Sequence, residues 1–90
     1  MELNPHLGSL VMDTALTGAL DFDLTVRTTV PNGYRQRVTL EDGGGQNITL
    51  GTNVYAIATA PTPATNAKSN ILMFEYYNGD ALLVEAYQEA

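Results

Sequence analysis

Side chains that could perform acid–base or thiol chemistry are few in this sequence and lack partners at useful spacings. His6 is the only histidine, and a general base needs a positioned partner, which the residues around Pro5 do not provide. Cysteine is absent, which removes thiol nucleophiles and thiolate zinc sites together. We therefore expect His6 to be an ordinary surface residue and the protein not to be an enzyme.

Carboxylates near turns are the remaining candidates for a metal or phosphate site. Asp21 and Asp23 share one face of a predicted strand, about 7 Å apart by the rise per residue, and could hold a calcium ion with loop oxygens. Asp42, which precedes three glycines, could do likewise. No EF-hand ladder of oxygen ligands accompanies them, and the glycines lack the Gly-Lys-Ser/Thr continuation of a phosphate-binding loop. We expect solvated carboxylates and a turn, with no metal and no cofactor.

Aromatic side chains offer a different kind of site. Flat, amphipathic rings can stack on sugars, and they equally fill cores and protein interfaces. The sequence has five tyrosines: Tyr34, Tyr55, Tyr76, Tyr77 and Tyr87. Packing in a core or an interface is the favoured interpretation, and a glycan platform is the alternative.

The length and charge of the chain exclude several classes of function. Ninety residues make one domain. Four basic against ten acidic residues give a net charge of −6, which argues against nucleic acid, because phosphate binding needs clustered Lys and Arg. Apolar runs fall far short of the roughly 20 residues that span a bilayer, so we expect no membrane partner. A domain this small has little spare stability, which makes oligomerisation or docking on a partner attractive.

Short alternating segments separated by turn residues predict the fold. Residues 20–27 and 35–41 alternate apolar and polar side chains, as half-buried strands do. Further short strands are predicted at residues 46–50, 54–58, 68–77 and 81–87. No segment has sustained helical periodicity. We expect an all-β fold, a jelly-roll-like antiparallel two-sheet β-sandwich with about six to eight short strands and almost no helix.

Turn residues predict how these strands connect. Residues 31–33 suit a β-turn, because proline fixes φ and the asparagine and glycine that follow accept positive φ. Residues 42–45 are expected to close a hairpin between the two strands that flank them. Residues 60–66 contain two prolines and should form an extended connection.

The last hairpin is the most strongly specified element, because Asn78-Gly79 is the best short-range signal for a two-residue turn. Such a turn pairs Tyr77 with Asp80, Tyr76 with Ala81, Glu75 with Leu82, Phe74 with Leu83 and Met73 with Val84. One face of the hairpin then holds Leu72, Phe74, Tyr76, Ala81, Leu83 and Tyr87. The opposite face holds Ile71, Met73, Tyr77, Leu82, Val84 and Ala86 and is nearly as apolar.

Two apolar faces on one hairpin indicate that both are covered. One face would pack the core of the sandwich. We hypothesise that the other is a subunit interface, as in a homotrimer. The alternative is that the N-terminal residues cover it within the same chain. The interface residues would be Ile71, Met73, Tyr77, Leu82 and Val84.

The first residues of the chain have no clean period, with Pro5, Gly8 and Gly18 as breakers. We interpret residues 1–17 as an N-terminal arm with a short strand and residues 18–90 as the β-sandwich domain. The arm would either cover a sheet edge of its own chain or reach onto a neighbouring subunit.

A series of short motifs resembles a module of tailed-bacteriophage virion proteins. The motifs are Gly33-x-Arg35-x-Arg37-Val-Thr-Leu-x-Asp42-Gly-x-Gly45, Ile48-Thr-Leu-Gly51-x-Asn53-Val, Ala60-Pro61-Thr62, Asn66-Ala67 and Phe74-x-Tyr76-Tyr-Asn-Gly79. In tail fibres and related phage surface proteins, a similar order of elements tends to close a β-rich C-terminal domain. No long fibre shaft precedes the module here, so we expect a small protein that binds directly to a capsid.

The resemblance implies a non-enzymatic structural protein of the virion, made in the host cytoplasm. The form it favours is a head decoration or cement protein that stabilises a phage capsid. Its partners would be the major capsid protein and copies of itself in a homotrimer. The capsid-contact arm would present Leu3, Leu7, Leu10, Val11 and Met12. The alternative is a tail-fibre or receptor-binding tip, in which loops around Asn53, Thr62 and Asn78 would touch host glycans.

Overall fold

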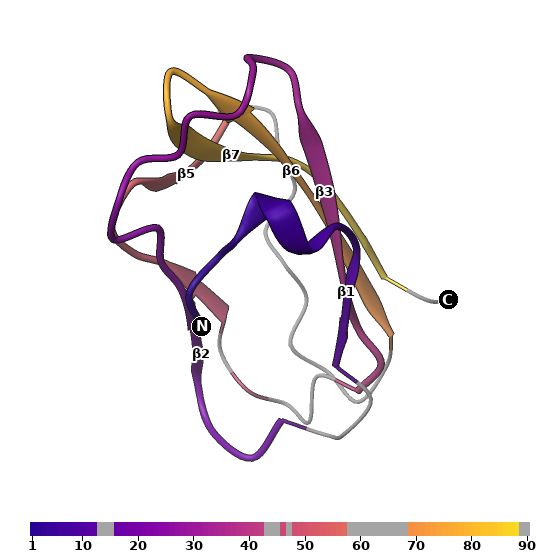
Figure 1. Ribbon diagram of the computed structural model, residues 1–90. Coiled ribbons are helices and arrows are strands. Elements are labelled where there is room, and N and C mark those ends of the chain that lie inside the picture. Colours follow the sequence, from indigo (N-terminus) through magenta and orange to yellow (C-terminus); the bar gives the residue numbers. More distant parts are fainter. Residues whose placement is uncertain (13–15, 43–45, 47, 58–68, 89–90) are drawn as a thin grey trace.

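The computed structural model describes residues 1–12, 16–42, 46, 48–57 and 69–88, and these residues form two β-sheets (Figure 1). The elements are η1, a 3-10 turn (Pro5–Leu7), and the strands β1 (Leu10–Met12), β2 (Leu20–Phe22), β3 (Arg35–Leu40), β4 (Ile48–Leu50), β5 (Val54–Ala56), β6 (Asn70–Tyr77) and β7 (Asp80–Gln88). The described residues contain no α-helix. The predicted all-β class is confirmed.

The large sheet is mixed and the small sheet is parallel, so the prediction of a wholly antiparallel, jelly-roll-like arrangement was wrong. The large sheet has the order β1-β3-β6-β7-β5, and the small sheet pairs β2 with β4. The pairs β3–β6 and β6–β7 are antiparallel, whereas β1–β3, β5–β7 and β2–β4 are parallel. The cause is the path of the chain, which alternates between the sheets from β1 to β5, and parallel neighbours need such long connections.

The prediction of a hairpin around residues 42–45 was also wrong, because the chain alternates between the two sheets. The strand before this turn, β3, pairs with β1 and β6, whereas the strand after it, β4, pairs with β2 in the other sheet. Residues 43–45 lie outside the described part of the chain, as do residues 60–66. The strands before and after residues 43–45 therefore lie in different sheets and do not pair with each other.

The hairpin of β6 and β7 confirms the predicted turn and most of the predicted register. Asn78 and Gly79 both have positive φ, 50° and 83°, as a two-residue turn that matches the strand twist requires. The pairs from Tyr77–Asp80 to Phe74–Leu83 are as predicted. Beyond them a β-bulge leaves Val84 as an extra residue, so Met73 pairs with Glu85 and not with Val84.

The bulge reverses the predicted faces at the end of β7. Ala86 pairs with Leu72 and packs against the core, whereas Tyr87 pairs with Ile71 and is 57% exposed. One inserted residue moves every later side chain to the other face, because strand side chains alternate.

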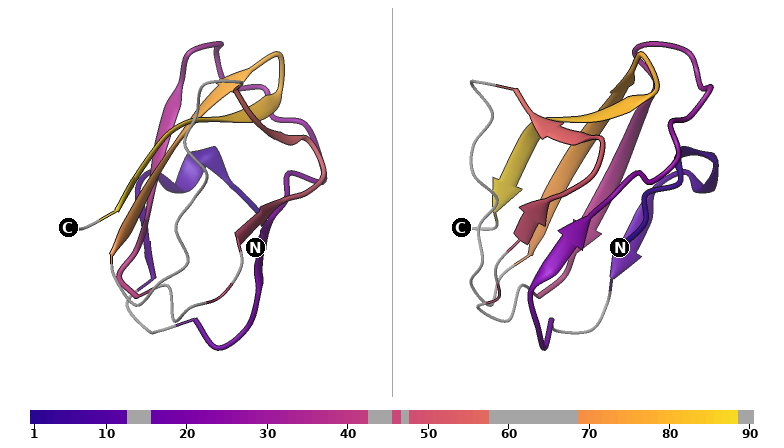
Figure 2. Two further views of the ribbon diagram at one scale, coloured as in Figure 1. Left: turned by 180° about the vertical axis from the view of Figure 1, so that it is seen from behind. Right: turned by 90° about the vertical axis from the view of Figure 1, so that its left-hand side faces the viewer.

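The core lies where β2 and the residues beside it pack against the inner face of the large sheet (Figure 2). The rings of Phe22 on β2 and Phe74 on β6 are in tilted contact, with centroids 5.3 Å apart. Inward-facing residues of β3, β6 and β7 supply most of the remaining buried apolar surface: Val38, Leu40, Leu72, Tyr76, Ala81 and Leu83. The alternation of residues 35–41 predicted a half-buried strand, and the burial pattern of β3 confirms it.

The strand predicted at residues 20–27 is shorter than its alternation indicated. Leu24 is still buried, but Val26 is 79% exposed. The Arg27 guanidinium pairs with Asp80 at 2.8 Å, and the Thr28 amide donates to the Gly79 carbonyl at 3.1 Å. These contacts draw the segment out of the small sheet and toward the turn between β6 and β7.

The buried side chain of Gln36 connects the N-terminal residues to the large sheet. Its Nε2 donates to the carbonyls of Asn4 and Gly8, at 2.8 and 2.7 Å, and its Oε1 accepts from the Tyr76 hydroxyl at 2.6 Å. These bonds hold both ends of the η1 turn. Burial of Tyr76 raises the pKa of its phenol, so the hydroxyl stays a donor.

We expect Tyr76→Phe to lower the free energy of unfolding by about 1–3 kcal/mol, because the buried Gln36 oxygen loses its donor. Urea denaturation measures this change. Tyr34→Phe is the matched control, since Tyr34 is partly exposed and contacts Tyr76 through its ring. Equal stability of the two variants would contradict the role given to the hydroxyl.

We expect Gly51→Ala to destabilise the protein by about 1–3 kcal/mol, because a Cβ at residue 51 would overlap the Asp23 carboxylate. The added atom would lie 2.0 Å from Asp23 Oδ1, and that oxygen is held by the Thr52 amide at 3.0 Å. Thermal unfolding tests this, with Gly18→Ala as control, where the added atom meets nothing within 4 Å. A Gly51→Ala midpoint at or above that of the control would refute the clash.

Candidate functional site

The face of the large sheet that points away from β2 and β4 is the main candidate, and we call it the outer face. Its residues follow from the strand register and the alternation of side chains. They are Val11 of β1; Arg35, Arg37 and Thr39 of β3; Ile71, Met73, Glu75 and Tyr77 of β6; Leu82, Val84, Glu85 and Tyr87 of β7; and Tyr55 of β5.

The outer face has an apolar middle and a rim of tyrosines and charged groups. Ile71, Met73, Leu82 and Val84 are half-buried between neighbouring side chains. Tyr55 and Tyr77 are each 50% exposed, and Tyr87 is 57% exposed. All the residues predicted as a subunit interface therefore lie together on this face, although their role as an interface stays a prediction.

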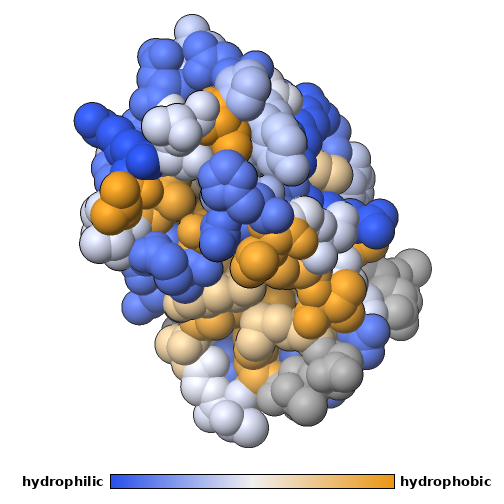
Figure 3. Space-filling model, in the orientation of Figure 1, coloured by the Kyte–Doolittle hydropathy of each residue, from blue (hydrophilic) through white to orange (hydrophobic). Residues whose placement is uncertain are grey.

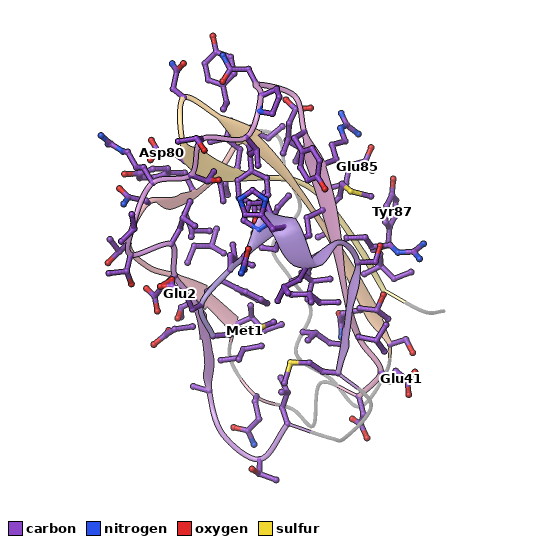
Figure 4. The ribbon with its side chains drawn as sticks, in the orientation of Figure 1. Met1, Glu2, Glu41, Asp80, Glu85 and Tyr87 are labelled. Atoms are coloured by element: carbon purple, nitrogen blue, oxygen red, sulfur yellow. The ribbon has the colours of Figure 1, made fainter. Side chains whose placement is uncertain are left out.

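Charged groups of both signs stand beside the apolar middle. The Arg35 Nε donates to Glu75 Oε1 at 3.0 Å across β3 and β6. Figure 4 shows Glu85 and Tyr87 on the side of the molecule opposite Met1 and Glu2. A hydrogen bond to the Glu85 carboxylate, and its charge, raise the pKa of the exposed Tyr87 phenol.

Sequence reasoning missed Glu85 and Tyr87 as members of this surface. Strict alternation from the Asn78-Gly79 turn places Tyr87 inward, and no residue in the sequence marks the bulge at Val84. The outward positions of Arg35 and Arg37 could be read from the alternation of β3, and the structure places them there.

The residues predicted as a capsid-contact arm do not form one surface. Leu3 is buried in the core, and Leu10 and Met12 pack partly against it. Leu7 in η1 and Val11 in β1 are exposed, at 64% and 60%. Figure 3 shows apolar residues gathered on the face that carries η1 and β1. β1 pairs with the edge of β3 in the same chain, while the alternative contact with a neighbouring subunit is untested.

A shallow groove of about 280 Å³ lies between the first residues and the segment after β2. Its lining residues are Glu2, Leu3, Asn4, Pro5, His6, Leu24, Val26 and Thr28. The Glu2 carboxylate accepts from the Thr25 amide at 3.0 and 3.1 Å, which lowers the pKa of Glu2. The groove thus contains the single histidine and one carboxylate that is already engaged by the backbone.

Three of the other predicted polar residues have structural roles. The Asp23 carboxylate accepts a hydrogen bond from the Thr52 amide at 3.0 Å. Asn53, whose φ is 55°, donates from Nδ2 to the Leu24 carbonyl at 2.9 Å. The Asn78 amide donates to Asn32 Oδ1 at 2.8 Å. Thr62 lies outside the described residues. Among the described residues, His, Asp and Glu form no group of three that could hold a metal ion.

Comparison with protein-family models, with curated proteins and with solved structures found no match for this chain. Within the described part of the chain, no helix has the length and apolar character needed to cross a membrane. The candidate site therefore rests on the geometry of the outer face alone.

We expect Glu2→Gln to reduce stability at neutral pH and to have little effect in acid. A carboxyl whose folded pKa is lowered adds stability above its unfolded pKa and loses this contribution as the pH falls through the folded pKa. Melting temperatures of both proteins across acid and neutral pH test this. If the difference between the two melting temperatures stays constant as the Glu2 carboxylate titrates, the lowered pKa of Glu2 would be contradicted.

Proposed function

We propose that this protein is a non-enzymatic structural protein that joins a larger assembly through the outer face. The assembly we propose is a phage virion, in which the protein is a head decoration or cement protein. The observation that supports this is a continuous surface of half-buried aliphatic side chains and exposed tyrosines on β6 and β7. The phage context comes from the resemblance of the motifs between Gly33 and Gly79 to those of phage surface proteins.

The composition of the outer face matches that of protein interfaces. Interface centres are enriched in aromatic residues, Met and Arg, and their rims are polar. Here Met73 and Ile71 occupy the middle, with Tyr87 and Arg37 at the periphery. A sheet face of this kind, left in water, is an unusual feature of a small monomer.

We further propose that the two sheets form a two-layer sandwich, although the parallel pairs depart from a jelly roll. The contact between Phe22 and Phe74 supports this, because it joins the small sheet to the inner face of the large one. Such a scaffold covers the inner face within the chain and leaves the outer face for partners. A homotrimer is one of the assemblies that this surface allows.

The proposed mechanism is stabilisation by mass action. A protein that binds only the assembled capsid lowers the free energy of that state and leaves the free subunits unaffected. The domain must then be a rigid, preorganised surface, because ordering on binding would cost affinity. The hydrogen bonds of Gln36 supply this rigidity at the N-terminal side of β3.

The exposed tyrosines favour one alternative, a glycan-binding tip, since Tyr55, Tyr77 and Tyr87 present partly exposed rings on one face. The loop residues first considered for this role support it less. Asn53 and Asn78 are engaged in the turns described above. Failure to bind capsids combined with binding to host cells would favour this alternative.

The first test is the protein content of particles made by the virus that encodes the chain. We expect mass spectrometry of purified particles to find this protein at a copy number comparable with that of the capsid protein. Particles that lack the protein would contradict the virion assignment.

The second test locates the contact with a matched pair of variants. We expect Val84→Asp, on the outer face, to abolish rebinding to particles stripped of the protein. Val26→Asp should bind like the wild type, because that valine is exposed on another surface. Equal binding by the two variants, each folded by circular dichroism, would show that the outer face is not the contact.

A further inference from the structure

The charges of the outer face complement one another under a two-fold rotation. We infer that the partner of this face is a second copy of the chain, packed face to face about an axis that runs along β6. This inference rests on the proposed function, because it names the partner of the same surface in the free protein. Face-to-face pairing buries the outer face, so the pair must separate before that face binds a particle. Its basis is the register of charged residues across three neighbouring strands.

Arg37, Met73 and Glu85 form one row across the outer face. Arg37 on β3 pairs with Met73 on β6, and Met73 pairs with Glu85 on β7. Neighbouring strands lie about 4.8 Å apart, so the two charged residues are roughly 10 Å apart in one chain. Within the described part of the chain, no salt bridge joins Arg37 to a carboxylate. The row therefore places opposite charges at equal distances on either side of β6.

A two-fold axis parallel to β6, between two facing sheets, exchanges the positions of β3 and β7. It sets Arg37 of each copy opposite Glu85 of the other, with the two Met73 side chains between them. Ile71 pairs with both Thr39 and Tyr87, so Thr39 of one copy likewise meets Tyr87 of the other. The two-fold pairing thus forms two equivalent Arg37–Glu85 ion pairs, one on each side of an apolar centre.

The remaining charges allow the two faces to approach. Glu75 lies on the axial strand and would meet its counterpart, but its charge is compensated by Arg35 of its own chain. Two arginines and two glutamates make the outer face neutral, whereas the whole chain has a net charge of −6. Self-repulsion at this face is therefore small.

The size of the face sets the expected strength of association. Five strands with a central strand of eight residues give an area of at most roughly 20 by 27 Å, because the edge strands β1 and β5 have three residues each. Stable interfaces bury about 800 Å² per partner, so this pairing should depend on protein concentration. Packed sheets lie about 10 Å apart, a gap that an arginine and a glutamate can bridge together.

Charge reversal on the full chain tests the pairing. Sedimentation equilibrium from about 10 μM to about 1 mM should show the wild type passing from one chain to two. Arg37→Glu and Glu85→Arg should each weaken dimerisation at least about tenfold, because like charges then face each other. The double variant should restore wild-type dimerisation. Asp21→Arg, the same charge change as Glu85→Arg but on the exposed face of β2, should have no effect.

Other outcomes overturn the inference. A mass of three chains, or a double variant as weak as the single ones, excludes the two-fold pairing but leaves the proposed function intact. A chain that stays single throughout excludes self-pairing, and Val84-dependent binding to particles then reports on the proposed function separately. If circular dichroism shows that a charge-reversal variant does not fold, the neutral variants Arg37→Gln and Glu85→Gln replace it. Unchanged dimerisation of both neutral variants would also exclude the pairing.

Discussion

The arrangement of this protein depends on one buried amide, the side chain of Gln36. It bonds to the carbonyls on both sides of the η1 turn and to the Tyr76 hydroxyl. A buried polar group without partners costs free energy, so these bonds fix the path of the first residues over the inner face of β3. With the inner face filled by Phe22, Leu24 and Leu3, the outer face is left as the surface for partners.

The sequence predicted the local parts of the fold well. The alternation of residues 35–41 specifies β3, and Asn78-Gly79 specifies both the turn and the register close to it, because these signals act between neighbouring residues. The three parallel pairings were missed, since partners far apart in the chain leave no local pattern. The glycines of residues 43–45 permit many backbone paths, and a crossing between sheets fits them as well as a hairpin.

The candidate site was predicted in part, for a related reason. The apolar residues Ile71, Met73 and Leu82 follow directly from the register near the turn. Glu85 and Tyr87 lie beyond the bulge, and their positions depend on one inserted residue that the sequence does not mark. Glu85 balances the charge of the outer face, and Tyr87 is its most exposed ring. The sequence therefore predicts an apolar surface but not the opposite charges on either side of β6.

Radical labelling of tyrosines tests most directly the claim that the outer face is a protein interface. The four partly exposed rings divide into Tyr55, Tyr77 and Tyr87 on the outer face and Tyr34, which precedes β3 and contacts the buried Tyr76 ring. Mass spectrometry would compare labelling in dilute protein and in the assembled state. We expect protection of the three outer tyrosines on assembly and unchanged labelling of Tyr34. Unchanged labelling of all four, or protection of Tyr34 alone, would contradict it.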